Sequence, residues 1–314
     1  MILEEIAAKT GLRKEYLARI AGSASHRYKT YRIPKRKGGY RTIHHPSRQL
    51  KFIQGWLVDN LFKYFPIHDA VYSYQLGRGI KDLATLHLRN NYLLRVDFQD
   101  FFPSLLNSDV IRLLTSNNNR FPIRLSEEDY VIIASLVCRN SQLTIGSPCS
   151  PILSNAILHD FDTHWFEQAR QTGVTYSRYA DDLYFSTNAP NVLQGILRDL
   201  HSDLQQRGSP RLKINEAKTV FTSRKRKRLV TGLILTSTNQ ISVGRERKRH
   251  LKSLVYKFAQ NRLEVEKVTY IRGFLSYIQG VEPSFLKRLT EKYGAEVLDR
   301  LSATSVGFDQ HRKR

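Results

Sequence analysis

Two adjacent aspartates, Asp181 and Asp182, constrain this chain more than any other feature. They stand between two runs of apolar and β-prone residues, 174–179 and 183–186, a pattern that predicts a strand, a tight turn and a second strand. Neighbouring side chains on an extended strand point to opposite faces, so adjacent carboxylates reach one site only where the chain bends. Two carboxylates held together repel each other unless a cation lies between them. Two interpretations stay open on these residues alone: a solvated hairpin tip, because Asp is common in turns, or a metal site.

The charge of the chain favours a polyanionic partner. Its 314 residues carry a formal net charge of +22 and a pI near 10.1, which favours nucleic acid or an anionic membrane surface. No apolar run approaches the ~20 residues needed to span a bilayer, and no signal-peptide pattern opens the chain. Cys138 and Cys149 provide neither a disulfide framework nor a zinc cluster. We therefore expect a soluble protein of a reducing compartment, with no membrane partner.

A third aspartate follows an apolar run earlier in the chain. Residues 92–96 predict a short strand with Asp97 at its carboxyl end, and the chain then turns at Pro103. Three carboxylates on adjacent strands make the oxygen-rich site that Mg²⁺ prefers. Two such ions, roughly 3.5–4 Å apart, can activate a hydroxyl and stabilise a leaving pyrophosphate. The sequence therefore predicts Asp97, Asp181 and Asp182 as catalytic metal ligands for two Mg²⁺ ions, with Mn²⁺ as the alternative.

Apolar periodicity predicts most of the remaining elements. Residues 2–21 carry two short helices interrupted at Gly11, an outline shared with helix-turn-helix DNA readers; packing on the next domain is the preferred interpretation. A hairpin with Lys37 in its tip precedes a return strand over residues 40–44. Further helices are expected over residues 48–65, 108–115, 127–139, 152–170, 190–206, 246–262, 264–279 and 283–301, and an apolar strand over 229–235.

The order of these features resembles the palm of reverse transcriptases. The run Tyr179–Asp182 matches the catalytic hairpin of that family, and residues 97–102 are similar to the block that carries its first metal-binding aspartate. The resemblance implies an α+β, right-hand polymerase fold: fingers, a palm with an antiparallel sheet and packed helices, and an all-helical thumb. The implied segments are residues 1–26 (N-terminal helices), 27–90 (fingers), 91–244 (palm, with finger-associated helices around 108–150), 245–301 (thumb) and 302–314 (a disordered basic tail).

The resemblance also implies which residues bind the nucleotide. Arg41 falls in the first fingers block, whose arginine contacts the incoming triphosphate. Phe102 falls at the position of the aromatic sugar gate, where a ring would clash with a ribose 2′-OH; the implied substrates are therefore dNTPs. The alternative for Phe102 is an ordinary core residue.

Two further blocks of the family are present. Gly146 belongs to a loop that resembles the template-and-nucleotide loop, although Ile145 stands where the family has glutamine. Lys213, Asn215 and Lys218 match the block that follows the catalytic hairpin, and Lys213 is the residue expected to bind the nucleotide.

Within the family, the chain is most similar to bacterial retron reverse transcriptases. Val230, Thr231 and Gly232 match the retron triplet associated with recognising the cognate RNA, whereas the Asn-Ala-x-x-His element is present only in part, at residues 83–87. The resemblance implies an enzyme of the bacterial cytoplasm that binds a structured noncoding RNA and primes from an RNA 2′-OH. Its product would be single-stranded DNA joined to RNA (msDNA), made in anti-phage defence together with an effector protein.

A basic run adjoins this triplet and is expected to contact RNA phosphates. Its members are Arg224, Lys225, Arg226, Lys227 and Arg228; a solvated loop is the alternative.

Two other functions of the protein remain open. One is another short bacterial reverse transcriptase, such as an abortive-infection or group II intron-like polymerase, which the absence of a structured RNA gene upstream would favour. The other is a non-catalytic RNA-binding scaffold, against which the three aspartates argue.

Overall fold

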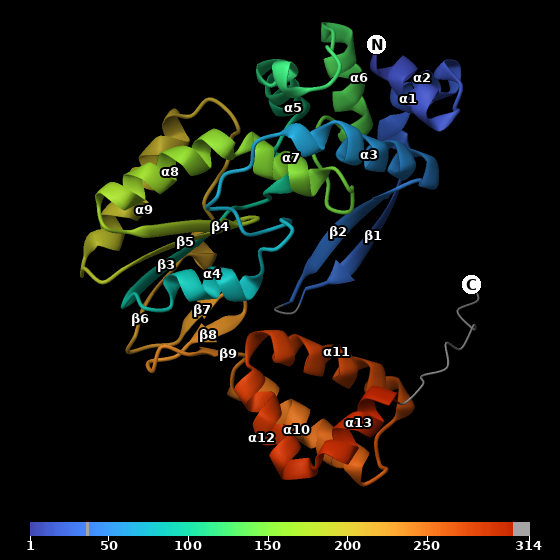
Figure 1. The fold of residues 1–314 in the computed structure, drawn as a ribbon. Helices are drawn as coiled ribbons and strands as arrows, with labels where there is room; N and C mark the ends of the chain where they lie inside the picture. Colours follow the sequence, from blue (N-terminus) through green and yellow to red (C-terminus); the bar gives the residue numbers. More distant parts are fainter. Residues whose placement is uncertain (36–37, 304–314) are drawn as a thin grey trace. The chain divides into compact units, whose positions relative to one another are not determined.

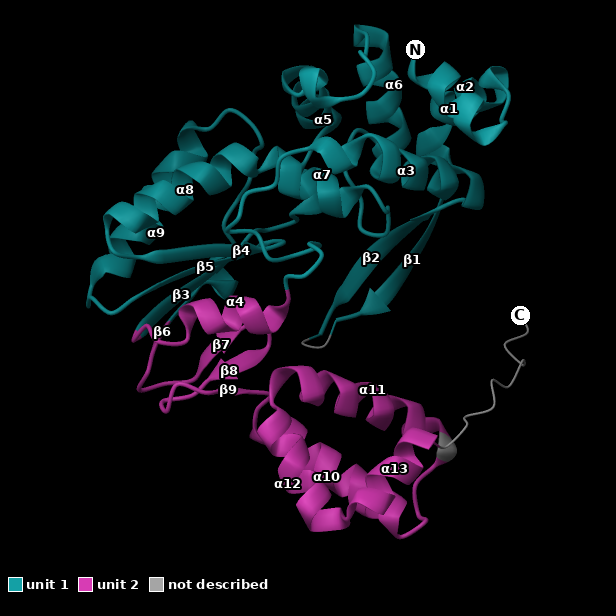
Figure 2. Ribbon diagram, in the orientation of Figure 1, with its two compact units in different colours: residues 1–78, 92–221 teal, residues 79–91, 222–314 magenta. Residues whose placement is uncertain are grey.

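The computed structural model describes residues 1–35 and 38–303 (Figure 1). They form two compact units: residues 1–78 with 92–221, and residues 79–91 with the chain from residue 222 onward (Figure 2). Helices and antiparallel sheets both contribute, so the predicted α+β class is confirmed. The five predicted segments do not coincide with these units, because residues 27–90 and residues 91–244 each contribute to both. The segment boundaries stay a prediction. No helix within the described ranges is long and apolar enough to cross a membrane.

Two helices open the first unit, as predicted. They are α1 (Ile2–Thr10) and α2 (Lys14–Gly22), and Gly11 ends α1 in the left-handed conformation, with φ of 71°. Their apolar faces, including Ile6 and Leu17, are buried in the main core. The amide of Ile2 donates a hydrogen bond to Asp129 Oδ1 of α6 (Glu127–Val137) at 2.7 Å. The preferred interpretation, that these helices pack on the next domain, is therefore confirmed.

An antiparallel hairpin follows, formed by β1 (Tyr28–Pro34) and β2 (Tyr40–Pro46). Tyr28 pairs with Pro46 at its base and Pro34 with Tyr40 near its tip. The predicted hairpin is thus confirmed, although its expected tip residue Lys37 lies outside the described residues.

The central sheet has the strand order β4-β5-β3-β6. Its strands are β3 (Tyr92–Asp97), β4 (Thr175–Tyr179), β5 (Asp182–Thr187) and β6 (Val220–Ser223). The helices α8 (His159–Gln171) and α9 (Val192–Gln206) cover one face (Figure 1). Trp165 of α8 packs edge-on against Phe185 of β5, with ring centroids 5.7 Å apart. This apolar packing fixes which face of β5 lies against α8 and therefore the register of the strands that carry the aspartates.

The other helices of the first unit match the predictions except in two places. They are α3 (Arg48–Asn60), α5 (Asn107–Ser116), α6, and α7 (Ser150–Ile157). The helix predicted over 48–65 ends at Asn60 and continues as a short 3₁₀ turn, Phe62–Tyr64. The prediction of a single helix over 152–170 is wrong, because α7 ends before Leu158 and α8 begins after it. Leu158 is fully buried at this corner, so apolar periodicity continues across the break and hides it.

The second unit joins a short early segment to the C-terminal part of the chain. Helix α4 (Ile80–His87) packs on a three-stranded antiparallel sheet of β7 (Arg228–Val230), β8 (Leu233–Leu235) and β9 (Ile241–Ser242). The strand predicted over 229–235 is therefore a hairpin. Its turn residues Thr231 and Gly232 have φ of 46° and 84°, the pair of positive values typical of tight hairpin turns.

Four helices complete the described part of the second unit: α10 (Arg245–Ala259), α11 (Val265–Val281), α12 (Pro283–Tyr293) and α13 (Ala295–Ala303). The helix predicted over 283–301 is divided at Gly294, whose φ of 87° does not continue a helix. Residues 302 and 303 of the expected basic tail belong to α13, and residues 304–314 lie outside the described part of the chain.

Candidate active site

The three predicted aspartates meet at one end of the central sheet. Asp97, the last residue of β3, lies directly opposite Asp182, the first residue of β5, in the antiparallel register. Directly opposed residues point their side chains to the same face. Asp181 lies in the two-residue turn between Tyr179 and Asp182, and its carbonyl accepts a hydrogen bond from Phe98 N at 3.0 Å. The bend that adjacent carboxylates need in order to share a site is therefore present.

The turn contains a backbone conformation that is costly for its residue. Ala180 has φ of 55°, in the left-handed region that glycine adopts without strain. Alanine in this region costs roughly 1–2 kcal/mol relative to a right-handed conformation. The surrounding structure must therefore hold Ala180 in place.

The site concentrates negative charge away from water. Asp97 is only 7% exposed. Burial raises the pKa of Asp181, and the neighbouring charge of Asp97 raises it further. Burial and then the charge of Asp181 raise the pKa of Asp182 to about 6, although the Arg95 guanidinium opposes the shift. A cation placed among these carboxylates would relieve both effects.

Basic side chains already lie beside two of the carboxylates. Lys218 Nζ lies 2.7 Å from Asp97 Oδ1, and Arg95 Nε lies 3.9 Å from Asp182 Oδ1. The Tyr184 hydroxyl donates to Asp182 Oδ2 at 3.2 Å. Over the part of the chain that the structure describes, no group of three His, Cys, Asp or Glu side chains is arranged to hold a metal ion. The chemistry of the donors nevertheless fits a hard divalent cation, because every ligand atom offered is a carboxylate oxygen.

A cavity of about 650 Å³ adjoins the turn. Its lining includes Arg41, Tyr74, Phe102, Arg139, Asp181 and Lys218. Arg41 is exposed on β2, and Phe102 is half-buried in a 3₁₀ turn, Phe102–Ser104, with its ring centroid 5.3 Å from that of Phe101. The structure thus brings the predicted residues Arg41 and Phe102 to one cavity with Asp181. Their roles toward a nucleotide stay predictions.

Gly146 contributes through its backbone. It is not among the residues that line the cavity, but its neighbour Ile145 is, and the Ile145 carbonyl accepts a hydrogen bond from His44 N at 2.8 Å. Gly146 has φ of 114°, and a Cβ there would lie 2.7 Å from the carbonyl oxygen of His44. Glycine is therefore required for this loop to lie against β2.

The expectation for Lys213 is not supported. Its side chain lines a separate cavity with His201 and Arg211, while its carbonyl accepts a hydrogen bond from Gln99 N at 2.8 Å. Lys218 is the lysine of this block that reaches the aspartates. The chain turns through a 3₁₀ segment, Glu216–Lys218, between the two positions. Both lysines match the family block in sequence, and only the fold separates their positions.

Tyr74 and Arg139 are among the cavity residues that the sequence does not predict. Tyr74 has φ of 58° and is 53% exposed, and it lies in a turn-rich stretch that carries no catalytic motif. Arg139 follows α6 in a loop and lines the same cavity. A positive φ in a non-glycine residue often marks a functional position. The residue type of Tyr74 does not predict its positive φ.

The residues predicted to bind RNA lie in the second unit and differ in exposure. Lys225, Arg226 and Lys227 are exposed in the turn before β7. The Arg224 guanidinium donates to the side chain of Asn239. Arg228 is fully buried, and its guanidinium donates to the backbone carbonyls of three residues: Leu88 at 3.3 Å, Thr236 at 3.0 Å, and Asn90. Arg228 is therefore committed to the fold, and we remove it from the residues expected to contact RNA.

The retron triplet forms the turn of the β7–β8 hairpin. The side chain of Val230 is fully buried, so it supports the turn from within and is also removed from the residues expected to contact RNA. Thr231 and Gly232 are partly exposed at the turn itself. Arg247 of α10 donates to the carbonyl of Gly232 at 3.0 Å, which ties the turn to the helix.

Comparison with known proteins identifies the family. Residues 33–235 match the family described as reverse transcriptase (RNA-dependent DNA polymerase). The retron Ec83 reverse transcriptase of Escherichia coli is 34% identical over 288 residues, which cover 89% of this chain and 91% of that protein. The chain belongs to the retron reverse transcriptases. The retron Ec73 reverse transcriptase of E. coli is 31% identical and spans 86% of this chain and 88% of that protein.

Membership gives the chain the activity of an RNA-directed DNA polymerase. Reverse transcriptases work with divalent metal ions, and the region that matches the family contains all three aspartates. Among solved structures, the foamy viral protease-reverse transcriptase in complex with double-stranded DNA aligns with a TM-score of 0.49 and 16% identity, over 87% of this chain and 43% of that chain.

Proposed function

We propose that this reverse transcriptase binds a cognate structured noncoding RNA, primes from a 2′-OH of that RNA, and copies part of it into RNA-linked single-stranded DNA. The observation that carries the polymerase site is the pairing of Asp97 with Asp182 beside Asp181, at the edge of a cavity lined by basic and aromatic residues. The retron type rests on relatives that span most of this chain. Bacterial relatives also support a place in the bacterial cytoplasm.

Asp97, Asp181 and Asp182 would hold two Mg²⁺ ions, or Mn²⁺ in their place. When bound, such ions activate the attacking hydroxyl and neutralise charge on the transferred phosphate. The carboxylates themselves contribute fixed position, because two of them are locked in strand register and the third in a tight turn. Phosphoryl transfer needs little more from a protein than position and charge.

The cavity beside Asp181 would take the incoming dNTP. Arg41 offers a guanidinium fork for the triphosphate, and Lys218 adds a second cation to the lining of the same cavity. Phe102 would exclude a ribose 2′-OH through its ring. Ile145 stands where the family has glutamine. This difference leaves the loop backbone unchanged, because the hydrogen bond between His44 and Ile145 involves only main-chain atoms.

Recognition of the RNA is assigned to the second unit. Lys225, Arg226 and Lys227 are exposed cations suited to phosphate contacts. Thr231 and Gly232 form a tight turn that can meet an RNA surface without a large side chain. Positive charge is spread through the whole chain, at +22, so these residues would supply selectivity on top of a general attraction for RNA.

The predicted fingers, palm and thumb are proposed as the working parts of this enzyme. The thumb helices, residues 245–301, would hold the duplex through backbone phosphates, with little base readout. An effector protein and a role in anti-phage defence are proposed from the retron resemblance. These two assignments concern the system in which the enzyme acts rather than its chemistry.

Expression of the chain together with its native upstream sequence tests the function. We expect a branched, RNase-resistant single-stranded DNA in extracts, whose RNA link is opened by a debranching enzyme. Cells carrying Asp181→Asn are the matched control and should contain the RNA without the DNA. DNA made without an RNA branch would favour another type of short bacterial reverse transcriptase, and the absence of any DNA from the wild-type protein would contradict the proposal.

A further inference from the structure

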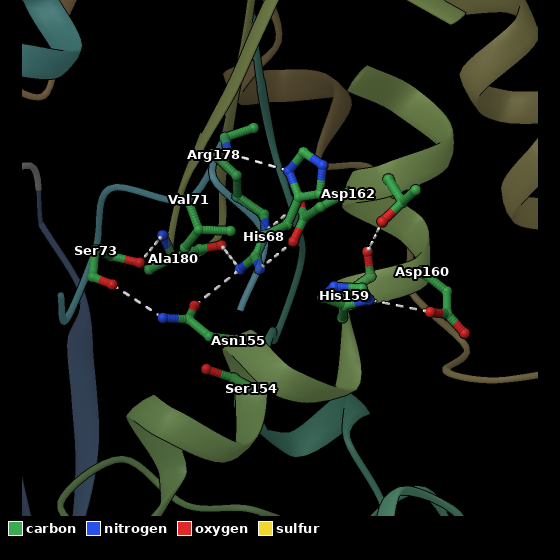
Figure 3. Close-up of polar contacts among 12 residues, drawn as sticks. His68, Val71, Ser73, Ser154, Asn155, His159, Asp160, Asp162, Arg178 and Ala180 are labelled. Carbon is green, nitrogen blue, oxygen red and sulfur yellow. Dashed lines mark hydrogen bonds and ion pairs between the residues drawn. The ribbon is translucent and has the colours of Figure 1, made fainter. Parts of the chain in front are cut away.

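A buried polar network lies directly behind the catalytic turn (Figure 3). Arg178 of β4 and Asp162 of α8 are both fully buried. They form a two-pronged ion pair, with Arg178 Nε 2.8 Å from Asp162 Oδ1 and Nη2 2.5 Å from Oδ2. The hydroxyl of Tyr176, also on β4, donates to Asp162 Oδ1 at 2.7 Å. The Tyr176 hydroxyl and the Arg178 guanidinium thus fix the orientation of the Asp162 carboxylate, which in turn orients the guanidinium.

Stability alone does not account for this ion pair. Taking two charges out of water costs as much as their attraction returns, and apolar residues of similar size often serve a core equally well. A buried arginine has value where its fixed fork of donors must hold something in place. The remaining nitrogen of Arg178 shows what is held: Nη1 lies 3.2 Å from the carbonyl oxygen of Ala180 and 3.2 Å from Asn155 Oδ1.

The contacts close into a ring around Ala180. Its amide donates to Ser73 Oγ at 2.8 Å, and its carbonyl accepts from Arg178. Asn155 of α7 joins these two partners, because its Nδ2 donates to the Ser73 carbonyl at 2.9 Å while its Oδ1 accepts from Arg178. Ser73 and Asn155 are both fully buried. Both polar backbone groups of Ala180 are therefore held by side chains that water does not reach.

Ala180 is the residue of the turn whose left-handed backbone is costly, with φ of 55°. Asp181 follows it directly, and its own carbonyl is held from the other side by Phe98 N. If Ala180 relaxed to a negative φ, the direction of the chain at Asp181 would change. The ring around Ala180 therefore determines where the Asp181 carboxylate points.

We propose that Arg178, Asn155 and Ser73 are positioning residues of the polymerase, which clamp Ala180 and thereby aim Asp181 at the site formed with Asp97 and Asp182. This inference rests on the proposed function of that site. None of the three residues touches the nucleotide cavity; they act through the backbone of the turn. Misplacement of a reacting group by about 1 Å can cost about 100-fold in rate, so the clamp should affect turnover strongly.

Ser73→Ala is the test variant, because it removes only the hydroxyl that accepts from Ala180 N. Thr187→Val is the matched control: Thr187 is 2% exposed on the same sheet, and its hydroxyl donates to the Gly173 carbonyl at 3.0 Å, away from the turn. We expect Ser73→Ala to lower kcat about tenfold or more and to raise the Mg²⁺ concentration for half-maximal rate. KM for dNTP, RNA affinity and the melting temperature should match those of Thr187→Val.

Hydrogen exchange gives a readout that needs neither metal nor activity. The Ala180 amide should be protected in the wild-type protein and in Thr187→Val, and should exchange about tenfold faster or more in Ser73→Ala. Arg178→Lys is the second variant, used if Ser73→Ala does not accumulate. Lysine keeps a positive charge near Asp162 but has a single nitrogen, so it cannot serve Asp162 and Ala180 together.

Unchanged kcat, Mg²⁺ dependence and Ala180 exchange in Ser73→Ala, with an active wild-type enzyme, would overturn the positioning role. A wild-type chain that makes no DNA would instead contradict the proposed function. In that case the exchange measurement still decides whether Ser73 clamps the turn, so the two failures are distinguishable.

Discussion

Asp97 and Asp182 face each other as paired residues of β3 and β5, and Lys218 lies 2.7 Å from the first of them. Like charges directly opposite each other destabilise a sheet. The pairing of Asp97 with Asp182 therefore lowers the stability of the metal-free protein. Its value lies in the chemistry that the two carboxylates serve. Apolar packing behind β5, through Phe185 and Trp165, fixes the register that brings the two aspartates together.

Lys218→Ala should lower kcat/KM for dNTP incorporation about 10–100-fold, because it removes the cation nearest Asp97 from the cavity wall. Lys213→Ala is the matched control from the same block. Its side chain lines a different cavity, so its kcat/KM should stay within about twofold of wild type. Steady-state incorporation on an RNA template measures both. Equal losses in the two variants would contradict the assignment of Lys218 to the site.

The contrast between these lysines shows where sequence reasoning ends. Strand and turn patterns in the sequence are enough to place the aspartates, because Asp97 ends an apolar run and Asp181 and Asp182 interrupt another. The structure brings all three to one end of the central sheet. Lys213 is the lysine expected to bind the nucleotide, but Lys218 is the one that reaches Asp97. The 3₁₀ turn between them is not visible in the residue types.

Burial was the other quantity that the sequence did not reveal. Arg228 was grouped with its exposed neighbours because a run of charge looks uniform in sequence, yet its guanidinium is consumed by backbone carbonyls. Arg178 shows the opposite case, because a single arginine in a strand is ordinary and its residue type does not indicate burial. Arg178 and Tyr176 are two residues apart in β4, which places both on one face of the strand. This spacing is the feature of the sequence that indicates burial of Arg178.

Phe102→Ala should reduce discrimination against ribonucleotides by about tenfold or more, because a clash with the 2′-OH is removed. Phe161→Leu is the control, since Phe161 is 3% exposed in the core and does not line the cavity. The ratio of kcat/KM for dNTP and rNTP is the measurement. Discrimination that survives in Phe102→Ala would show that another group reads the sugar.

Gly146→Ala should destabilise the first unit by about 2 kcal/mol or more, since it combines a strained φ with a contact of 2.7 Å to the His44 carbonyl. Gly173→Ala has a similar conformational cost, with φ of 66°, but nothing within 4 Å of the added Cβ. Its loss should be about 1 kcal/mol. Denaturant unfolding compares them, and equal losses would show that the loop is not pressed against β2.

Changing Lys225, Arg226 and Lys227 together to Gln should weaken binding of the cognate RNA and reduce the slope of log Kd against log salt by about 2–3. Changing Lys9, Arg13 and Arg19 to Gln removes the same charge from exposed positions of α1, α2 and the turn between them. Fluorescence anisotropy at several salt concentrations measures both. If the two triple variants lose affinity equally, only net charge matters and the assigned loop has no special role.

The central claim is that Asp97, Asp181 and Asp182 form a metal-dependent polymerase site. Its most direct test is single-turnover incorporation of a labelled deoxynucleotide by the purified chain bound to its RNA. The wild-type enzyme should extend the RNA with Mg²⁺ present and stop with chelator. Asp182→Asn should lose at least about 1,000-fold in rate, bind the RNA with unchanged affinity, and melt a few degrees higher without metal, since a buried repulsion is removed. Incorporation by Asp182→Asn at the wild-type rate would contradict the account.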